Sequence, residues 1–234
     1  AGRAVVVTGG DSGSGDAEAV SSVILATSGE PYHFYALSDE GCAGDDNLVL
    51  SNVYDCLTFL EADGSISPGL AESWSISEDG LCYTFYLREG VKFHNGYDFT
   101  AEDVKFTFDK GAAGPLGSAL FVNFKSCEIV DDYTVNICLT APYAGFLYGA
   151  ASRLGGICCK AYYDEVGDEG YLKAPIGTGP YTIDEVIHGE KIVLRAHDGY
   201  WPGSPALKEA PNAQAPNAST PVLGLDNGHH TPAP

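Results

Sequence analysis

The residues that could carry out chemistry are scattered along this sequence without the spacing that catalysis requires. Its histidines, serines and aspartates form neither a Gly-x-Ser-x-Gly nucleophile elbow nor a His-Glu-x-x-His zinc motif. The run Gly177-Thr178-Gly179-Pro180 could be read as a phosphate loop, but no Gly-Lys-Ser/Thr follows it, and Pro180 lacks an N–H donor. Close backbone packing is the better interpretation of these glycines. The missing constellations predict a protein that is not an enzyme and uses no cofactor or metal.

Single histidines and cysteines are better explained by structure than by catalysis. His94 lies beside the turn Asn95-Gly96 and is expected to be satisfied by nearby backbone, while His229-His230 is a weak metal pair or, more simply, a solvated tail. The seven cysteines contain no CxxC pair, which excludes a zinc ribbon. We expect most of them to be buried as small apolar residues. An oxidising compartment would permit some to pair, and the odd count leaves at least one without an intrachain partner.

The charge balance excludes two classes of partner. Twelve basic residues stand against 32 acidic ones, for a formal net charge of −20. Such a surface repels nucleic acid and anionic lipid headgroups.

No stretch approaches the ~18 apolar residues of a membrane span. The chain opens without a methionine or a signal peptide, so we expect a processed or excised product.

The aromatic residues mark the extent of the core, because all of them lie between Tyr32 and Trp201. Residues 1–22 read as a flexible Gly/Ser-rich extension, in which a valine run could form a strand only against a partner. Residues 210–234 read as a Pro/Ala/Asn-rich tail. We therefore expect the folded part to lie between these ends.

Periodicity and turn residues predict a mixed α/β core. The expected strands are 22–27, 82–88 and 192–195, with a hairpin over 128–139 about Asp131-Asp132. The expected helices are 46–60, one opening at a capping box on Thr100, and one running from Pro142 to 154. Between the second strand and the capped helix, strand, tight turn and strand should alternate, with Leu87, Val91 and Phe93 packing inward.

Several of these segments resemble one known family. They are PGLAESW at 68–74, LREGVKFHNG at 87–96, TAEDV at 100–104, PIGTGPY at 175–181 and DGYW at 198–201. Together they resemble the family 5 extracellular solute-binding proteins of ABC transporters, the oligopeptide-, dipeptide- and nickel-binding group. The resemblance covers roughly residues 23–209. Nothing after Ala210 resembles the second large lobe that members of this family build.

The resemblance implies a fold and a division of the chain. The fold would be α/β with a mixed sheet: a truncated type II periplasmic-binding-protein-like lobe with an inserted smaller α/β subdomain. Residues 23–55 and 165–209 would form the first lobe, and 56–164 the insertion. We expect the second lobe to be missing.

The resemblance also implies where a solute would bind. The turn after the first strand borders the ligand cleft in this family, and Glu30, Pro31, Tyr32 and His33 occupy it here. Ligands of such folds lie at the carboxyl ends of strands, and an extended peptide could be held there by main-chain hydrogen bonds. The alternative is that the turn is a plain surface loop.

The function implied is solute capture for an ABC importer. The intact parent would bind a peptide or small solute, close two lobes around it and deliver it to the permease. Its location would be extracytoplasmic: periplasmic or cell-surface, with a lipid anchor in the precursor, or secreted. The alternative is a structural subunit that reuses the scaffold and forms homo-oligomers through its terminal strands.

Overall fold

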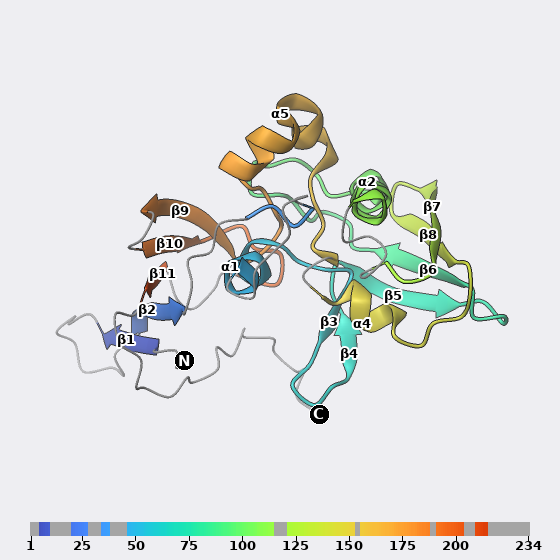
Figure 1. Cartoon of the computed structure of the whole chain (residues 1–234), viewed down its shortest axis with the longest axis horizontal. Coiled ribbons are helices and arrows are strands. Elements are labelled where there is room, and N and C mark those ends of the chain that lie inside the picture. The colour runs from blue at the N-terminus through green and yellow to red at the C-terminus, as the bar shows by residue number, and fades with distance from the viewer. Residues whose placement is uncertain are drawn as a thin grey trace. The chain divides into compact units, whose positions relative to one another are not determined.

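The fold is described from a computed structural model, which divides the chain into two compact units (Figure 1). Unit 1 comprises residues 1–30 and 180–234, and unit 2 comprises residues 31–179. The described residues are 5–9, 20–27, 34–37, 46–114, 121–152, 155–187, 191–203 and 209–214. Among them, no helix is long and apolar enough to cross a membrane.

Unit 1 is built on a five-stranded mixed sheet with the order β1-β2-β11-β10-β9. Its strands are β1 (Val5–Gly9), β2 (Val20–Thr27), β9 (Tyr181–Ile187), β10 (Lys191–Ala196) and β11 (Glu209–Gln214). Only β2 and β11 run parallel, and the other neighbours are antiparallel. The mixed sheet and the strands predicted at 22–27 and 192–195 are confirmed.

The ends of the chain differ from the expectation of a free extension and a free tail. The valine run forms β1 and pairs with β2 of the same chain, from Val5 opposite Leu25 to Val7 opposite Val23. Strand β11 begins at Glu209, one residue before the predicted tail, runs into that tail and occupies the position between β2 and β10. Residues 10–19 and 215–234 lie outside the described residues. Both ends thus contribute strands to unit 1.

The two compact units meet at 30/31 and 179/180. Tyr54 and Tyr171 are both buried within unit 2. The division into first-lobe segments and an insertion, with boundaries at 55/56 and 164/165, stays a prediction from the resemblance.

Unit 2 is built on a four-stranded antiparallel sheet with the order β5-β6-β8-β7, beside the two-stranded pair β3-β4. Its strands are β3 (Thr58–Leu60), β4 (Ile66–Pro68), β5 (Ala71–Ile76), β6 (Cys82–Leu87), β7 (Phe124–Asp131) and β8 (Thr134–Leu139). The predicted strand over 82–88 and the hairpin about Asp131-Asp132 are confirmed. Alternate residues of β6, namely Tyr83, Phe85 and Leu87, are buried as their spacing predicts.

Four helices of the described residues complete unit 2, and two of them are shorter than predicted. They are α1 (Asp46–Val53), α2 (Ala101–Ala113), α4 (Phe146–Ala150) and α5 (Lys160–Lys173). Helix α1 ends at Val53 because Thr58 already begins β3. The helix predicted from Pro142 begins only at Phe146, after the N-cap Gly145. Helix α2 packs against β7, β8 and α5 (Figure 1).

The turns between β6 and α2 follow the prediction closely. Val91 and Phe93 are buried, and Lys92 and Glu89 are exposed. Gly96 adopts φ +88° and its N–H donates to the Phe93 carbonyl at 2.8 Å, which reverses the chain. The hairpin that carries the family-like sequence is therefore architectural.

Asp103 caps two helices with one buried carboxylate. It accepts the Thr100 N–H at 2.9 Å, which completes the predicted capping box of α2. Its other oxygen accepts the Lys160 N–H at 2.8 Å, in the first turn of α5. Burial raises the pKa of Asp103 from its usual 3.8 to about 6, although the hydrogen bonds from Lys160 and Thr100 act to lower it.

The raised pKa predicts a pH-dependent stability. Because the pKa is higher in the folded protein, the stabilisation from Asp103 is complete below pH 3.8 and is lost as the pH rises through about 6. We expect the free energy of unfolding, relative to that of Asp103→Asn, to fall by about 3 kcal/mol across this window. Urea unfolding of both proteins at a series of pH values measures the difference. An Asp103 carboxyl that titrates below pH 4 by NMR would contradict the prediction.

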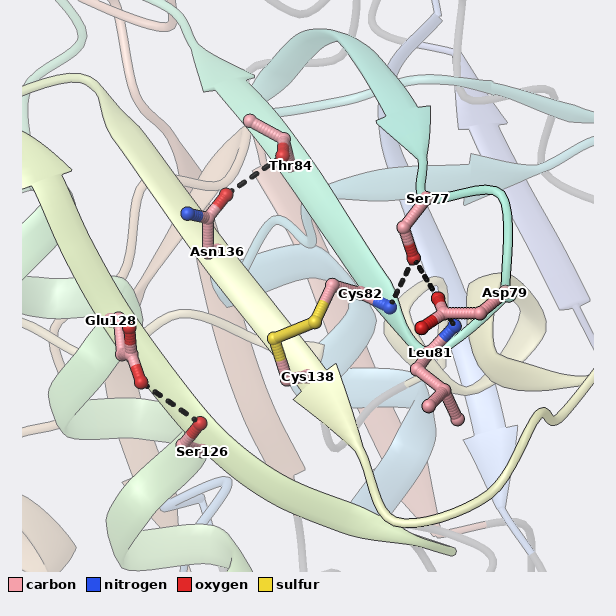
Figure 2. Close-up of a disulfide and its surroundings, with 9 residues drawn as sticks. All are labelled: Ser77, Asp79, Leu81, Cys82, Thr84, Ser126, Glu128, Asn136 and Cys138. Carbon is pink, nitrogen blue, oxygen red and sulfur yellow. Dashed lines mark hydrogen bonds between the residues drawn. A yellow bond between two sulfur atoms is a disulfide. The ribbon is translucent and has the colours of Figure 1, made fainter.

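One disulfide crosses the sheet of unit 2. It joins Cys82 on β6 to Cys138 on β8, which are directly opposite residues (Figure 2). On the same strands, the Thr84 hydroxyl donates to the Asn136 side chain at 2.7 Å (Figure 2). The remaining cysteines of the described residues are free and buried, as expected for most of them: Cys56, Cys127, Cys158 and Cys159. Cys42 lies outside the described residues.

Candidate functional site

The predicted solute-binding residues Glu30, Pro31, Tyr32 and His33 lie outside the described residues. The structure describes the chain on both sides of them. Strand β2 ends at Thr27, and the segment 34–37 follows, with all four of its residues buried. The segment 34–37 is therefore the described part of the chain that directly follows the predicted site.

Two tyrosines hold the segment 34–37 in unit 2. The Tyr54 hydroxyl donates to the Phe34 carbonyl at 3.0 Å. The ring of Tyr35 stacks on the ring of Tyr171, with 4.7 Å between their centroids. Tyr171 is fully buried, and burial raises its pKa well above the usual value, so its hydroxyl stays protonated. The chain that leaves the predicted turn is thus fixed by buried aromatic contacts.

The glycines of the run 177–179 allow backbone to lie directly against backbone. A Cβ on Gly177 would lie 2.0 Å from the Val53 carbonyl oxygen, and one on Gly179 would lie 2.6 Å from the Val53 carbonyl carbon. The Gly179 N–H donates to that same Val53 oxygen at 3.0 Å. The interpretation as close packing is confirmed, since no room for a phosphate remains against Val53.

His94 joins the predicted turn to the same run of glycines. Its backbone N–H donates to the Gly177 carbonyl at 2.9 Å. Its Nδ1 accepts the Gly177 N–H at 3.4 Å, and its Nε2 lies 2.9 Å from the Gly179 carbonyl. With Nδ1 accepting, Nε2 carries the proton and donates it to that carbonyl. The expectation that backbone satisfies this histidine is confirmed.

Three further hydrogen bonds complete this region. The Thr178 hydroxyl donates to the Asp55 carboxylate at 3.2 Å, and both side chains are buried. The Tyr171 hydroxyl donates to the Ile176 carbonyl at 2.8 Å and accepts the Cys159 N–H at 2.7 Å. Sequence reasoning missed Tyr54, Asp55 and Tyr171, because single buried residues outside a periodic pattern resemble ordinary core positions.

The described residues offer neither a metal-binding cluster nor an activated cysteine. They contain no group of three His, Cys, Asp or Glu side chains able to hold a metal ion. Burial raises the pKa of the Cys127 thiol to about 12 and that of Cys159 to about 11. Such thiols remain protonated at neutral pH and are poor nucleophiles. What this region can do is fix backbone segments beside the predicted turn.

Comparison with known proteins identifies the family. Residues 65–230 match the model of the bacterial extracellular solute-binding proteins, family 5 Middle. The chain belongs to this family. The family 5 chain is 36% identical over 178 residues to the dipeptide-binding protein of Escherichia coli, covering 66% of this chain and 33% of that protein. It is 34% identical over 207 residues to heme-binding protein A of Haemophilus influenzae, covering 78% of this chain and 38% of that protein.

Solved structures agree with this assignment. The family 5 chain superimposes on the periplasmic binding protein DppA of Helicobacter pylori in complex with the peptide STSA, with a TM-score of 0.71 and 32% identity. It superimposes on the oligopeptide-binding protein AppA of Bacillus subtilis in complex with a nonapeptide, with a TM-score of 0.73 and 29% identity. These alignments cover 82% of this chain and 42% and 39% of the two relatives. The chain spans about a third of the length of the curated relatives it matches.

Proposed function

We propose that this chain forms part of the solute-binding component of an ABC importer and that its solute is a peptide or a peptide-like molecule. Membership of family 5 is the observation that carries the proposal. Among its relatives, one is named for dipeptides and two were solved with bound peptides. We further propose that it acts as a binding protein and not as an enzyme, in keeping with its membership of a solute-binding family.

The proposed site is the turn Glu30–His33. It lies in the sequence between β2, a strand of unit 1, and the segment 34–37, which is anchored in unit 2. A peptide would be held there by main-chain hydrogen bonds, as an extended chain added beside a strand. The four residues that follow the turn, 34–37, are buried and give this end of the proposed site a fixed neighbour in the sequence.

We expect weak peptide binding by this chain, because a two-lobed cleft needs both walls. Titration with dialanine, followed by NMR, should shift the amide signals of Tyr32 and His33 with a dissociation constant of about 1 mM or weaker. Free alanine at equal concentration is the control ligand, and Tyr32→Ala is the control variant. Absence of any shift would reject the site. Tight binding would reject the need for a second wall.

The proposed location is extracytoplasmic, in the periplasm or at the cell surface. The Cys82–Cys138 disulfide supports it, since disulfides persist in oxidising compartments and are rare in the cytosol. A permease is the partner that an importer component would need. A lipid anchor in the precursor stays a prediction from the resemblance.

The alternative of a self-assembling structural subunit gains no support. One of its motivations was a valine strand that could pair with a neighbouring copy, and β1 has its partner in β2 of the same chain. Homo-oligomers through terminal strands remain a prediction from the sequence.

A further inference from the structure

The polypeptide passes between the two units twice, and both connections are held by the same few residues of unit 2. The passages lie at 30/31 and 179/180. We call the segment 34–37 the first connection and the segment 174–179 the second connection. They are separated by more than a hundred residues of sequence, yet the turn Val53–Asp55 and Tyr171 contact both.

The turn Val53–Asp55 uses three consecutive residues for this purpose. Tyr54 donates to the Phe34 carbonyl of the first connection. Val53 accepts the Gly179 N–H of the second connection, and Asp55 accepts the Thr178 hydroxyl. Because these residues are adjacent in one turn, neither connection can shift without disturbing the backbone that holds the other.

Tyr171 links the same two connections independently. Its ring stacks on Tyr35 of the first connection, and its hydroxyl donates to Ile176 of the second. The Cys159 N–H donates to that hydroxyl and fixes its orientation. The first connection is thus held by Tyr54 and Tyr171, and the second by Val53, Asp55 and Tyr171, so that Tyr171 contacts both.

We propose that Val53, Tyr54, Asp55 and Tyr171 form a connection clamp, which makes both chain connections move as one body with unit 2. Tyr54 and Tyr171 act as positioning residues within it. The clamp holds Phe34 and Tyr35, which follow directly after the proposed solute-binding residues Glu30–His33 in the sequence. Its link to solute binding rests on the proposed function, whereas the clamp itself does not.

Hydrogen exchange of the full chain, followed by mass spectrometry, tests the clamp without any solute. Tyr54→Phe removes one hydroxyl, which donates to the Phe34 carbonyl of the first connection. Loss of one buried hydrogen bond should accelerate exchange about fivefold in peptides covering 34–37. If the clamp couples the connections, exchange in 174–179 accelerates as well. In the native protein the His94 ring contacts Gly177 and Gly179 of the second connection. The reciprocal variant His94→Ala removes these contacts and should, through the clamp, accelerate exchange in 34–37.

Matched controls decide between coupling and general loosening. Tyr143→Phe makes the same chemical change at an exposed tyrosine and should leave both connections unchanged. Exchange in β6 and β8 should stay at the wild-type rate. Acceleration confined to the connection that each variant touches would overturn the clamp, and so would equal acceleration in β6 and β8. Either result leaves the peptide titration at Tyr32 and His33 to be judged separately.

Discussion

Loss of the Cys82–Cys138 disulfide should lower the free energy of unfolding of unit 2 by about 4 kcal/mol. The bond closes a loop with a sequence separation of 56, and the entropy that such a loop removes from the unfolded chain corresponds to about this value. The loop contains α2 and β7, so the bond restrains most of the sheet and the helix packed on it. The expected result applies to Cys82→Ala/Cys138→Ala.

Trp74 on β5 provides a local probe for this measurement. The chain has two tryptophans, and Trp201 belongs to unit 1, so a Trp201→Phe background makes the fluorescence report on unit 2 alone. Urea unfolding should give a lower midpoint for the double variant. Under a strong reductant the two proteins should unfold alike to within about 0.5 kcal/mol, because the bond is then absent from both. The prediction would be refuted if the urea midpoint of the protein that retains both cysteines were the same with and without the reductant.

Gly177→Ala should lower the free energy of unfolding of unit 2 by about 3 kcal/mol or more. The new methyl group would overlap the Val53 carbonyl oxygen, and this neighbour is backbone, which cannot rotate away. Gly177 does not have positive φ, so the cost would come from contact alone. Movement of the segment would also weaken the Gly179 bond to Val53 and the two contacts of the His94 ring.

Gly90→Ala is the matched control for that substitution. Gly90 has φ +74° and nothing within 4 Å of an added Cβ, so the change should cost about 1 kcal/mol through backbone conformation alone. Both variants can be compared by urea unfolding with Trp74 fluorescence. Equal stability of the two variants would show that the close approach at Gly177 is relieved cheaply.

The parts of unit 2 with a local signal could be predicted from the sequence. The alternation in β6, the capping box at Thr100 and the turn at Asn95-Gly96 each depend on a few neighbouring residues, and each is confirmed. The region around the site depends instead on contacts across more than 80 residues, such as His94 with Gly179. Those contacts leave no periodic pattern, which is why Tyr54 and Tyr171 were not singled out.

Errors in the predicted helices have a similar origin. Residues 46–60 contain apolar residues at helical spacing, but the spacing continues past the point where the chain turns into β3. Helix α5 was not predicted, because Gly167 at φ 63° interrupts it and its apolar residues do not form one stripe. Tertiary packing of Tyr171 supports this helix where local sequence does not.

The sheet order of unit 1 has a consequence for the order of folding during synthesis. Strand β2 needs β11 beside it, and these strands come from opposite ends of the chain. Unit 2 is one continuous stretch that precedes β11, so all of it emerges from the ribosome before the last strand of unit 1 does. Until then β2 can pair only with β1, and the edge of β2 that later pairs with β11 has no partner strand. Unit 2 can therefore fold while β2 of unit 1 still has an unpaired edge, and an unpaired strand edge is prone to pair with another chain.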